Sequence, residues 1–195
     1  MVMKKLIFFT FLICTIQLQA ISQIIKVQIE TDSGKIIAEL YPDKAPITCA
    51  NFIRYIENNK FEGANFYRVV RMDNQPNNDI KIEVIQGGLG FDVEESPYPS
   101  IIHETTELTG LKHMDGTISM ARAEPGTASS EFFICIGNQP ELDFGGKRNP
   151  DGQGFAAFGK VTEGMDIVKK IQNMPADGQM LINTVPIIKI ELVKY

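Results

Sequence analysis

The chain has 195 residues, of which 44% are hydrophobic and 22% are charged, a balance typical of a globular protein and not of a disordered or membrane one. Its length suits one domain with a sizeable core, and we find no internal repeat or linker that would divide it. The formal net charge is −5 and no basic block or stripe occurs, which argues against nucleic acid as a partner.

The first 22 residues have the pattern of a signal peptide. Lys4 and Lys5 precede an apolar run at residues 6–13, which is too short to span a bilayer. Small residues at positions 20 and 22 are typical of a cleavage site, so we expect cleavage before Gln23. Residues 23–195 then form one exported domain without a transmembrane segment, and we expect it to be periplasmic or secreted.

Two other interpretations of this N-terminal segment are open. One is a buried N-terminal helix, although the run is apolar on every side and carries its lysines at one end only. The other is lipid attachment at Cys14. It is disfavoured by the bulky Ile13 in front of the cysteine, where such sites have a small residue.

The domain begins with two segments in which apolar and polar residues alternate. Residues 25–31 and 36–40 have this period of two, which is typical of half-buried strands. The triplet Asp32-Ser33-Gly34 between them favours a turn. Together the three segments predict a β-hairpin.

A helix is predicted after the hairpin. Pro46 suits its first turn, and Asn58-Asn59 favour its end. Apolar residues at helical spacing predict the face that packs on the core. These residues are Ile47, Ala50, Ile53 (or Phe52) and Ile56.

The rest of the domain carries short strand-like segments and one more helix. The strand-like segments are residues 66–71, 80–86, 116–121, 132–136, 155–161 and 188–192. The second helix spans residues 165–171, and polar loops occupy residues 71–80 and 147–152. Many short strands, two helices and no strand–helix–strand alternation predict a mainly β fold, a closed antiparallel barrel with helices at its ends.

Groups that commonly carry catalysis or bind ligands are sparse. The two histidines, His103 and His113, provide too little material for a zinc site or a His-based triad. The glycines of residues 87–90 lack the lysine of a phosphate-binding loop, so neither a metal nor a cofactor is expected. For the cysteines of the domain, Cys49 and Cys135, we expect two separate buried thiols and not a disulfide.

Several short motifs occur in a fixed order along the domain. They are NFYRVV at residues 65–70, IQGG at 85–88, SMAR at 119–122, SEFFI at 130–134 and FGKV at 158–161. Each motif alone is unspecific, because a sequence such as FYRVV is an ordinary strand, but their joint order and spacing are specific. On these motifs the chain resembles the cyclophilin family over about residues 25–195.

The resemblance implies an eight-stranded antiparallel barrel capped by two α-helices. It also implies peptidyl-prolyl cis-trans isomerase activity in a shallow groove on the outer face of that barrel. By their place in the motifs, Arg68 matches the family's catalytic arginine and Gln86 matches its substrate-binding glutamine. The other substrate-binding positions that the resemblance implies are Val84, Ala121, Arg122, Glu131, Phe133, Leu142 and Phe155.

These residue types suit the reaction. Rotation about an X–Pro bond has a barrier of about 18–20 kcal/mol because the C–N bond is partly double, and no bond has to be broken. As the bond twists, its nitrogen regains a lone pair, to which a fixed guanidinium such as that of Arg68 can donate. An apolar pocket with Phe133 as its floor would hold the proline ring. We therefore expect the protein to bind proline-containing peptides and unfolded polypeptides. We also expect it to be a monomer.

Three acidic residues depart from the family pattern. Glu131 replaces a glutamine, and Glu83 stands where active relatives often carry an aromatic residue. Glu141 stands where many relatives carry tryptophan or another aromatic residue, which argues against binding of cyclosporin-like ligands. We interpret the three as making the groove acidic, so that substrates with basic residues next to the proline are preferred. An ion pair between Glu131 and Arg68 would in addition lower the rate about ten- to a hundredfold.

The predicted function is acceleration of X–Pro isomerisation during the folding of exported polypeptides. The alternative is a peptide-binding or chaperone-like domain that has the same groove but catalyses weakly or not at all. The joint presence of Arg68, Gln86 and Phe133 favours the enzyme.

Overall fold

The computed structural model describes residues 23–90 and 96–193. The predicted signal peptide, residues 1–22, lies outside the described residues. In the part of the chain that is described, no helix has both the length and the apolar character needed to cross a membrane.

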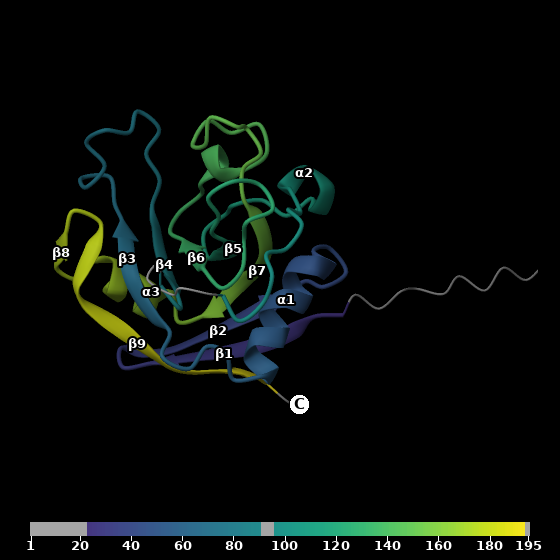
Figure 1. The fold of residues 1–195 in the computed structure, drawn as a ribbon. Coiled ribbons are helices and arrows are strands. Elements are labelled where there is room, and N and C mark those ends of the chain that lie inside the picture. The colour runs from purple at the N-terminus through teal and green to yellow at the C-terminus, as the bar shows by residue number, and fades with distance from the viewer. Residues whose placement is uncertain (1–22, 91–95, 194–195) are drawn as a thin grey trace, which may run out of the picture.

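The described residues form nine strands in one antiparallel sheet that closes on itself (Figure 1). The strands are β1 (Ile25–Thr31), β2 (Gly34–Leu40), β3 (Asn65–Val70), β4 (Val84–Gly88), β5 (Thr117–Met120), β6 (Phe132–Cys135), β7 (Ala156–Glu163), β8 (Ala176–Asp177) and β9 (Met180–Leu192). Neighbours follow the order β1–β2–β7–β5–β6–β4–β3–β9, and pairing of β9 with β1 completes an eight-stranded barrel. The short β8 pairs with β9 only. The predicted barrel is confirmed.

The interior of the barrel holds the main core. In β1, Val27 and Ile29 are fully buried, whereas the polar residues between them are less so, as alternation in a strand requires. Aromatic rings fill the centre. The ring of Phe132 lies edge-on to those of Phe52 and Phe66, with centroid distances of 5.3 and 5.7 Å.

The helix α1 (Pro46–Glu57) begins at the predicted proline, and a distant carboxylate caps it. Glu104, which is buried, accepts hydrogen bonds from the backbone N–H groups of Ile47 (3.1 Å) and Thr48 (2.7 Å). These N–H groups have no partner within the helix, so Glu104 satisfies them from another part of the chain.

The predicted packing face of α1 is confirmed at Ile56 and at Phe52, and it is wrong at Ile47 and Ala50. Ile47 is 39% exposed and Ala50 is exposed, whereas Phe52, the alternative to Ile53, is fully buried. Burying an aromatic ring removes more apolar surface from water than burying an alanine, so the aromatic residues set the orientation of the helix. The apolar residues buried on this helix are Cys49, Phe52, Tyr55 and Ile56.

The second predicted helix is α3 (Met165–Gln172), and two further short helices were not predicted. These are α2 (Thr106–Thr109) and the 3-10 helix η1 (Pro140–Leu142), which are too short to produce a helical repeat in the sequence. α1 contacts β7 and β9, while α3 contacts β2, β3 and β4.

Two strands begin more than two residues away from their predicted first residue. β4 begins at Val84 and not at residue 80, because the side-chain amide of Gln75 bonds to both the C=O (2.8 Å) and the N–H (3.3 Å) of Ile82. Those groups are then satisfied without a neighbouring strand. β9 begins at Met180 and not at residue 188, and Pro186 lies within it, where a proline in the sequence argues against a strand.

The cysteines agree with the expectation. Cys49 and Cys135 are both buried, and no disulfide joins them. The thiol of Cys49 donates to the carbonyl of Phe158 at 3.5 Å. Burial raises the pKa of Cys49 to about 12 and also raises the pKa of Cys135, so both thiols stay protonated at neutral pH.

Candidate active site

A second, smaller apolar cluster lies on the outer face of the barrel. In β6, Phe132 and Ile134 face the main core, whereas Phe133 belongs to the second cluster together with Val84 and Leu142. A cavity of about 550 Å³ opens over this cluster. Its lining contains every site residue predicted from the sequence: Arg68, Val84, Gln86, Ala121, Arg122, Glu131, Phe133, Leu142 and Phe155.

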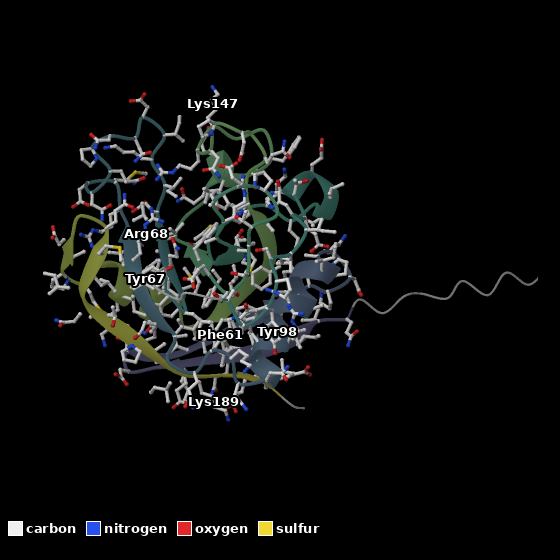
Figure 2. All side chains as sticks on the ribbon, in the orientation of Figure 1. Phe61, Tyr67, Arg68, Tyr98, Lys147 and Lys189 are labelled. Atoms are coloured by element: carbon white, nitrogen blue, oxygen red, sulfur yellow. The ribbon has the colours of Figure 1, made fainter. Side chains whose placement is uncertain are left out.

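A β-bulge in β3 directs two consecutive side chains toward the outer face. The ladder register shifts between Phe66 and Arg68 against both β4 and β9, so Tyr67 is an extra residue in the strand. Phe66 points into the core, while Tyr67 and Arg68 both hydrogen-bond to the side chain of Gln86. Figure 2 shows Tyr67 and Arg68 next to each other on this strand.

Two neutral amides hold the guanidinium of Arg68. Its Nη1 donates to Oε1 of Gln86 at 2.6 Å, and its Nε and Nη2 donate to Oε1 of Gln179 at 3.0 and 2.6 Å. Burial lowers the pKa of Arg68, yet a guanidinium titrates so far above neutrality that it stays charged. No described carboxylate forms an ion pair with it, so its positive charge faces the cavity uncompensated.

Glu131 does not pair with Arg68, and the corresponding expectation is wrong. The Glu131 carboxylate accepts hydrogen bonds from the Tyr67 hydroxyl, from the N–H of Gly90 (3.0 Å) and from the Ser130 hydroxyl (3.1 Å). It packs so closely on Gly88 that a Cβ there would lie 2.5 Å from Oε1 of Glu131. Its φ of 144° favours glycine at position 88, and a larger residue there would also displace the Glu131 carboxylate.

The tyrosine hydroxyl connects this carboxylate to Gln86. Nε2 of Gln86 donates to the Tyr67 oxygen at 2.9 Å, and the Tyr67 hydroxyl hydrogen goes to Glu131. Burial, reinforced by Glu131, raises the pKa of Tyr67, so the hydroxyl stays protonated. The amide of Gln86 is thereby fixed with its nitrogen toward Tyr67 and its oxygen toward Arg68.

The floor of the cavity is apolar. Phe133 is 4% exposed, and the ring of Phe155 meets it edge-on at a centroid distance of 5.3 Å. Beneath Phe133 the imidazole of His113 stacks at 5.9 Å. Val84 and Leu142 complete the floor. This arrangement presents a firm, uncharged surface to a ring-shaped group.

The imidazole of His113 under the floor belongs to a hydrogen-bonded Ser–His–Asp chain. We did not predict such a chain from the sequence. Nδ1 of His113 lies 2.8 Å from Asp143, and its Nε2 lies 2.9 Å from the Ser119 hydroxyl. Burial lowers the pKa of His113, which favours the neutral ring that donates to Asp143 and accepts from Ser119. Ser119 is fully buried, so the chain supports the floor and provides no accessible nucleophile.

Arg122 lines the cavity, but its guanidinium forms hydrogen bonds to the loop after η1. It donates to Asp151 at 2.8 and 3.0 Å and to the carbonyl of Gly154 at 2.6 and 2.8 Å. The hydrogen bond from Arg122 lowers the pKa of Asp151. The charge of Arg122 is therefore balanced within the protein, and its guanidinium is not directed at a substrate backbone.

Among the residues that the structure describes, Glu83 and Glu141 do not make the groove acidic, and that interpretation is wrong. Glu83 and Glu141 are absent from the described lining: Glu83 accepts from Gln172 at 3.5 Å, and Glu141 accepts from the N–H of Lys147 at 2.8 Å. The charged side chains that do line the cavity are Glu131 and the arginines Arg68, Arg122 and Arg148.

An eight-stranded barrel with an arginine, a glutamine and an apolar pocket on its outer face defines the chain as a cyclophilin-like protein. The model of the family "Cyclophilin type peptidyl-prolyl cis-trans isomerase/CLD" matches residues 26–192. The chain thus belongs to the cyclophilin-type peptidyl-prolyl cis-trans isomerases, and it is an enzyme of the isomerase class.

Bacterial relatives agree with this membership. A peptidyl-prolyl cis-trans isomerase of Acinetobacter baylyi is 37% identical over 164 residues, which are 82% of this chain and 78% of the relative. Peptidyl-prolyl cis-trans isomerase B of Escherichia coli is 32% identical over 164 residues, 82% of this chain and 92% of the relative.

The fold also matches solved structures. A crystal structure of a Cryptosporidium parvum cyclophilin-type isomerase superimposes with a TM-score of 0.72 at 24% identity, covering 89% of this chain and 99% of that one. The structure of that protein in the presence of the dipeptide Ala-Pro gives a TM-score of 0.70 at 25% identity, covering 87% and 99%.

Proposed function

We propose that the chain is an exported enzyme that accelerates X–Pro isomerisation in polypeptides and so assists their folding. Its cavity is the binding site for the proline, and Arg68 is the catalytic residue. The observation that carries the proposal is the uncompensated guanidinium of Arg68 beside the apolar floor formed by Phe133.

The geometry provides for selective stabilisation of the twisted amide. The hydrogen bonds of Arg68 to Gln86 and Gln179 use three of the five N–H groups of a guanidinium, so two remain for a substrate. The lone pair on the proline nitrogen exists only when the amide is twisted, so a bond to it lowers the barrier and not the energy of either planar isomer. A charged hydrogen bond of about 1.5–3 kcal/mol corresponds to roughly ten- to a hundredfold in rate.

The proline ring fits the floor, and the amide of Gln86 faces the same cavity. Proline-containing peptides are the substrates we propose for this chain, by analogy with the relative whose structure was determined in the presence of Ala-Pro. Export follows from the pattern of residues 1–22, with cleavage before Gln23. Cell fractionation of the full chain, with the mature N-terminus read by mass spectrometry, tests this part separately.

The test of catalysis is an isomerisation assay on residues 23–195 with a proline tetrapeptide. We expect Arg68→Ala to lower kcat/KM about a hundredfold, and Arg68→Lys to restore little because an ammonium cannot keep the planar set of hydrogen bonds. Peptide binding measured by fluorescence should change far less than the rate.

One observation favours the alternative, a peptide-binding or chaperone-like domain with weak catalysis. Gln179 holds two nitrogens of Arg68 at once, which restricts how far the guanidinium can follow the twisting nitrogen. If wild type binds peptides without accelerating their isomerisation, and Arg68→Ala changes neither property, this alternative replaces the enzyme.

A further inference from the structure

The loop between η1 and β7 brings a second arginine to the cavity. This loop returns on itself: the N–H of Phe155 donates to the carbonyl of Leu142 at 3.0 Å, and the N–H of Gly145 donates to the carbonyl of Gly152 at 2.7 Å. Figure 1 shows it at the same end of the barrel as the β3–β4 connection. Arg148 lies in this loop and lines the cavity together with the neighbouring Asn149.

The side chain of Arg148 has a defined position. Its backbone N–H donates to the carbonyl of Glu141 at 3.1 Å, and its Nη1 donates to the carbonyl of Ile80 in the β3–β4 connection at 2.6 Å. The guanidinium therefore bridges the two loops that border the cavity. One nitrogen is used by a neutral carbonyl, and the other N–H groups remain for a ligand.

The charge of Arg148 is not balanced by the described residues. It forms no ion pair with a described carboxylate, in contrast to Arg122, which pairs with Asp151. Burial lowers the pKa of Arg148, and the positive charge of Arg68, which lines the same cavity, lowers it further. Glu131, the carboxylate that lines the cavity, is already occupied by the Tyr67 hydroxyl and two further donors.

Two uncompensated guanidinium groups at one cavity favour an anion. A proline peptide is neutral at its backbone, so the anion has to come from a side chain near the proline. A carboxylate is the acceptor that the planar donor set of an arginine matches best.

We infer that Arg148 makes the isomerase selective for prolines that have an aspartate or glutamate within about two residues in the substrate. This inference rests on the proposed function, and it reverses the preference for basic residues that the sequence predicted. Arg148 is the specificity-determining residue, while Arg68 acts on the proline nitrogen.

The test compares matched tetrapeptides that differ only by Glu, Gln or Lys at each position flanking the proline. We expect wild type to show a kcat/KM for Glu about 5- to 20-fold above that for Gln at one position at least, with Lys lowest. Added salt should reduce this ratio, because the guanidinium is partly exposed.

The variants are Arg148→Gln and the charge reversal Arg148→Glu. We expect Arg148→Gln to bring the ratio of kcat/KM for the Glu and Gln peptides near one. We expect Arg148→Glu to give the Lys peptide a higher kcat/KM than the Glu peptide. If the only effect of a variant were loss of the hydrogen bond to Ile80, kcat/KM would fall equally for all peptides, and the order of the peptides would not reverse. The matched controls are Lys147→Gln and Lys147→Glu, which change the net charge equally in the same loop. The side chain of Lys147 is exposed and does not line the cavity. It points outward in Figure 2.

The outcome is separable from that of the proposed function. Dissociation constants of the same peptides report the preference even if the protein proves to bind without catalysis. Equal constants for Glu and Gln peptides in wild type, or a Glu preference that persists in Arg148→Glu, would overturn the role of Arg148 while leaving the isomerase intact.

Discussion

Removing the Tyr67 hydroxyl should weaken catalysis without touching Arg68. In Tyr67→Phe, Glu131 loses one of its three donors and Gln86 loses the acceptor that fixes its amide. Because Tyr67 is 6% exposed, water does not readily replace the lost hydroxyl. A neutral hydrogen bond contributes about 0.5–1.5 kcal/mol and a charged one about 1.5–3 kcal/mol.

Since Glu131 keeps the N–H of Gly90 and the hydroxyl of Ser130, we expect the free energy of unfolding to fall by about 1–2 kcal/mol, which is at or below the lower end of the sum of the two bonds. The effect on kcat/KM comes from Gln86, whose amide is then held by the hydrogen bond from Arg68 and no longer from both sides. We expect a loss of about three- to tenfold, compared with about a hundredfold for Arg68→Ala.

The assay is peptide isomerisation combined with urea unfolding of the same preparation. The matched control is Tyr55→Phe, which removes a buried hydroxyl that bonds to Ser96 at 2.7 Å, outside the cavity lining. It should lose a similar amount of stability and keep kcat/KM. If Tyr67→Phe keeps full kcat/KM, or loses as much as Arg68→Ala, the positioning of Gln86 by Tyr67 is refuted.

Two further predictions concern stability. Glu104→Ala should lower the free energy of unfolding by about 1.5–3 kcal/mol in urea, because the N–H groups of Ile47 and Thr48 lose their acceptor, while an unchanged kcat/KM is expected. Stability should also fall as the pH drops below 6.5, the ordinary pKa of histidine, because the lowered pKa of His113 means that the unfolded chain takes up protons first. In His113→Gln, urea unfolding should depend less on pH between about 6.5 and 5, and an equal slope would contradict this assignment.

The resemblance carried by the sequence motifs identified nine of the described residues that line the cavity, although not Arg148. Arg68, Gln86 and Phe133 lie on separate strands, and each is next to a residue of the barrel interior, so alternation agrees with the resemblance in placing them on the outer face. The strands themselves were predicted from the same alternation. The eight-stranded barrel therefore follows from short-range patterns and the resemblance.

Contacts that depend on irregular backbone could not be predicted. Alternation puts Tyr67 on the side opposite to Arg68, and only the bulge in β3 brings both to Gln86. Gln179 lies 111 residues from Arg68 in the sequence and directly follows Gly178. The glycine indicates a turn, but the sequence does not show in which direction the side chain of Gln179 points. The arginine in the loop after η1 belongs to a segment with no periodicity, so its direction depends on the folded loop alone.

The strand that closes the barrel, β9, also determines when during folding the barrel can be completed. β9 pairs with β3 as well as with β1, and it is the last strand along the described residues. Until residues 180–192 have been synthesised, β1 and β3 each keep one edge of hydrogen-bonding groups open. Contacts between the two ends of a chain make folding slow. The barrel therefore closes late in folding, and until it closes the chain is open to association through those edges.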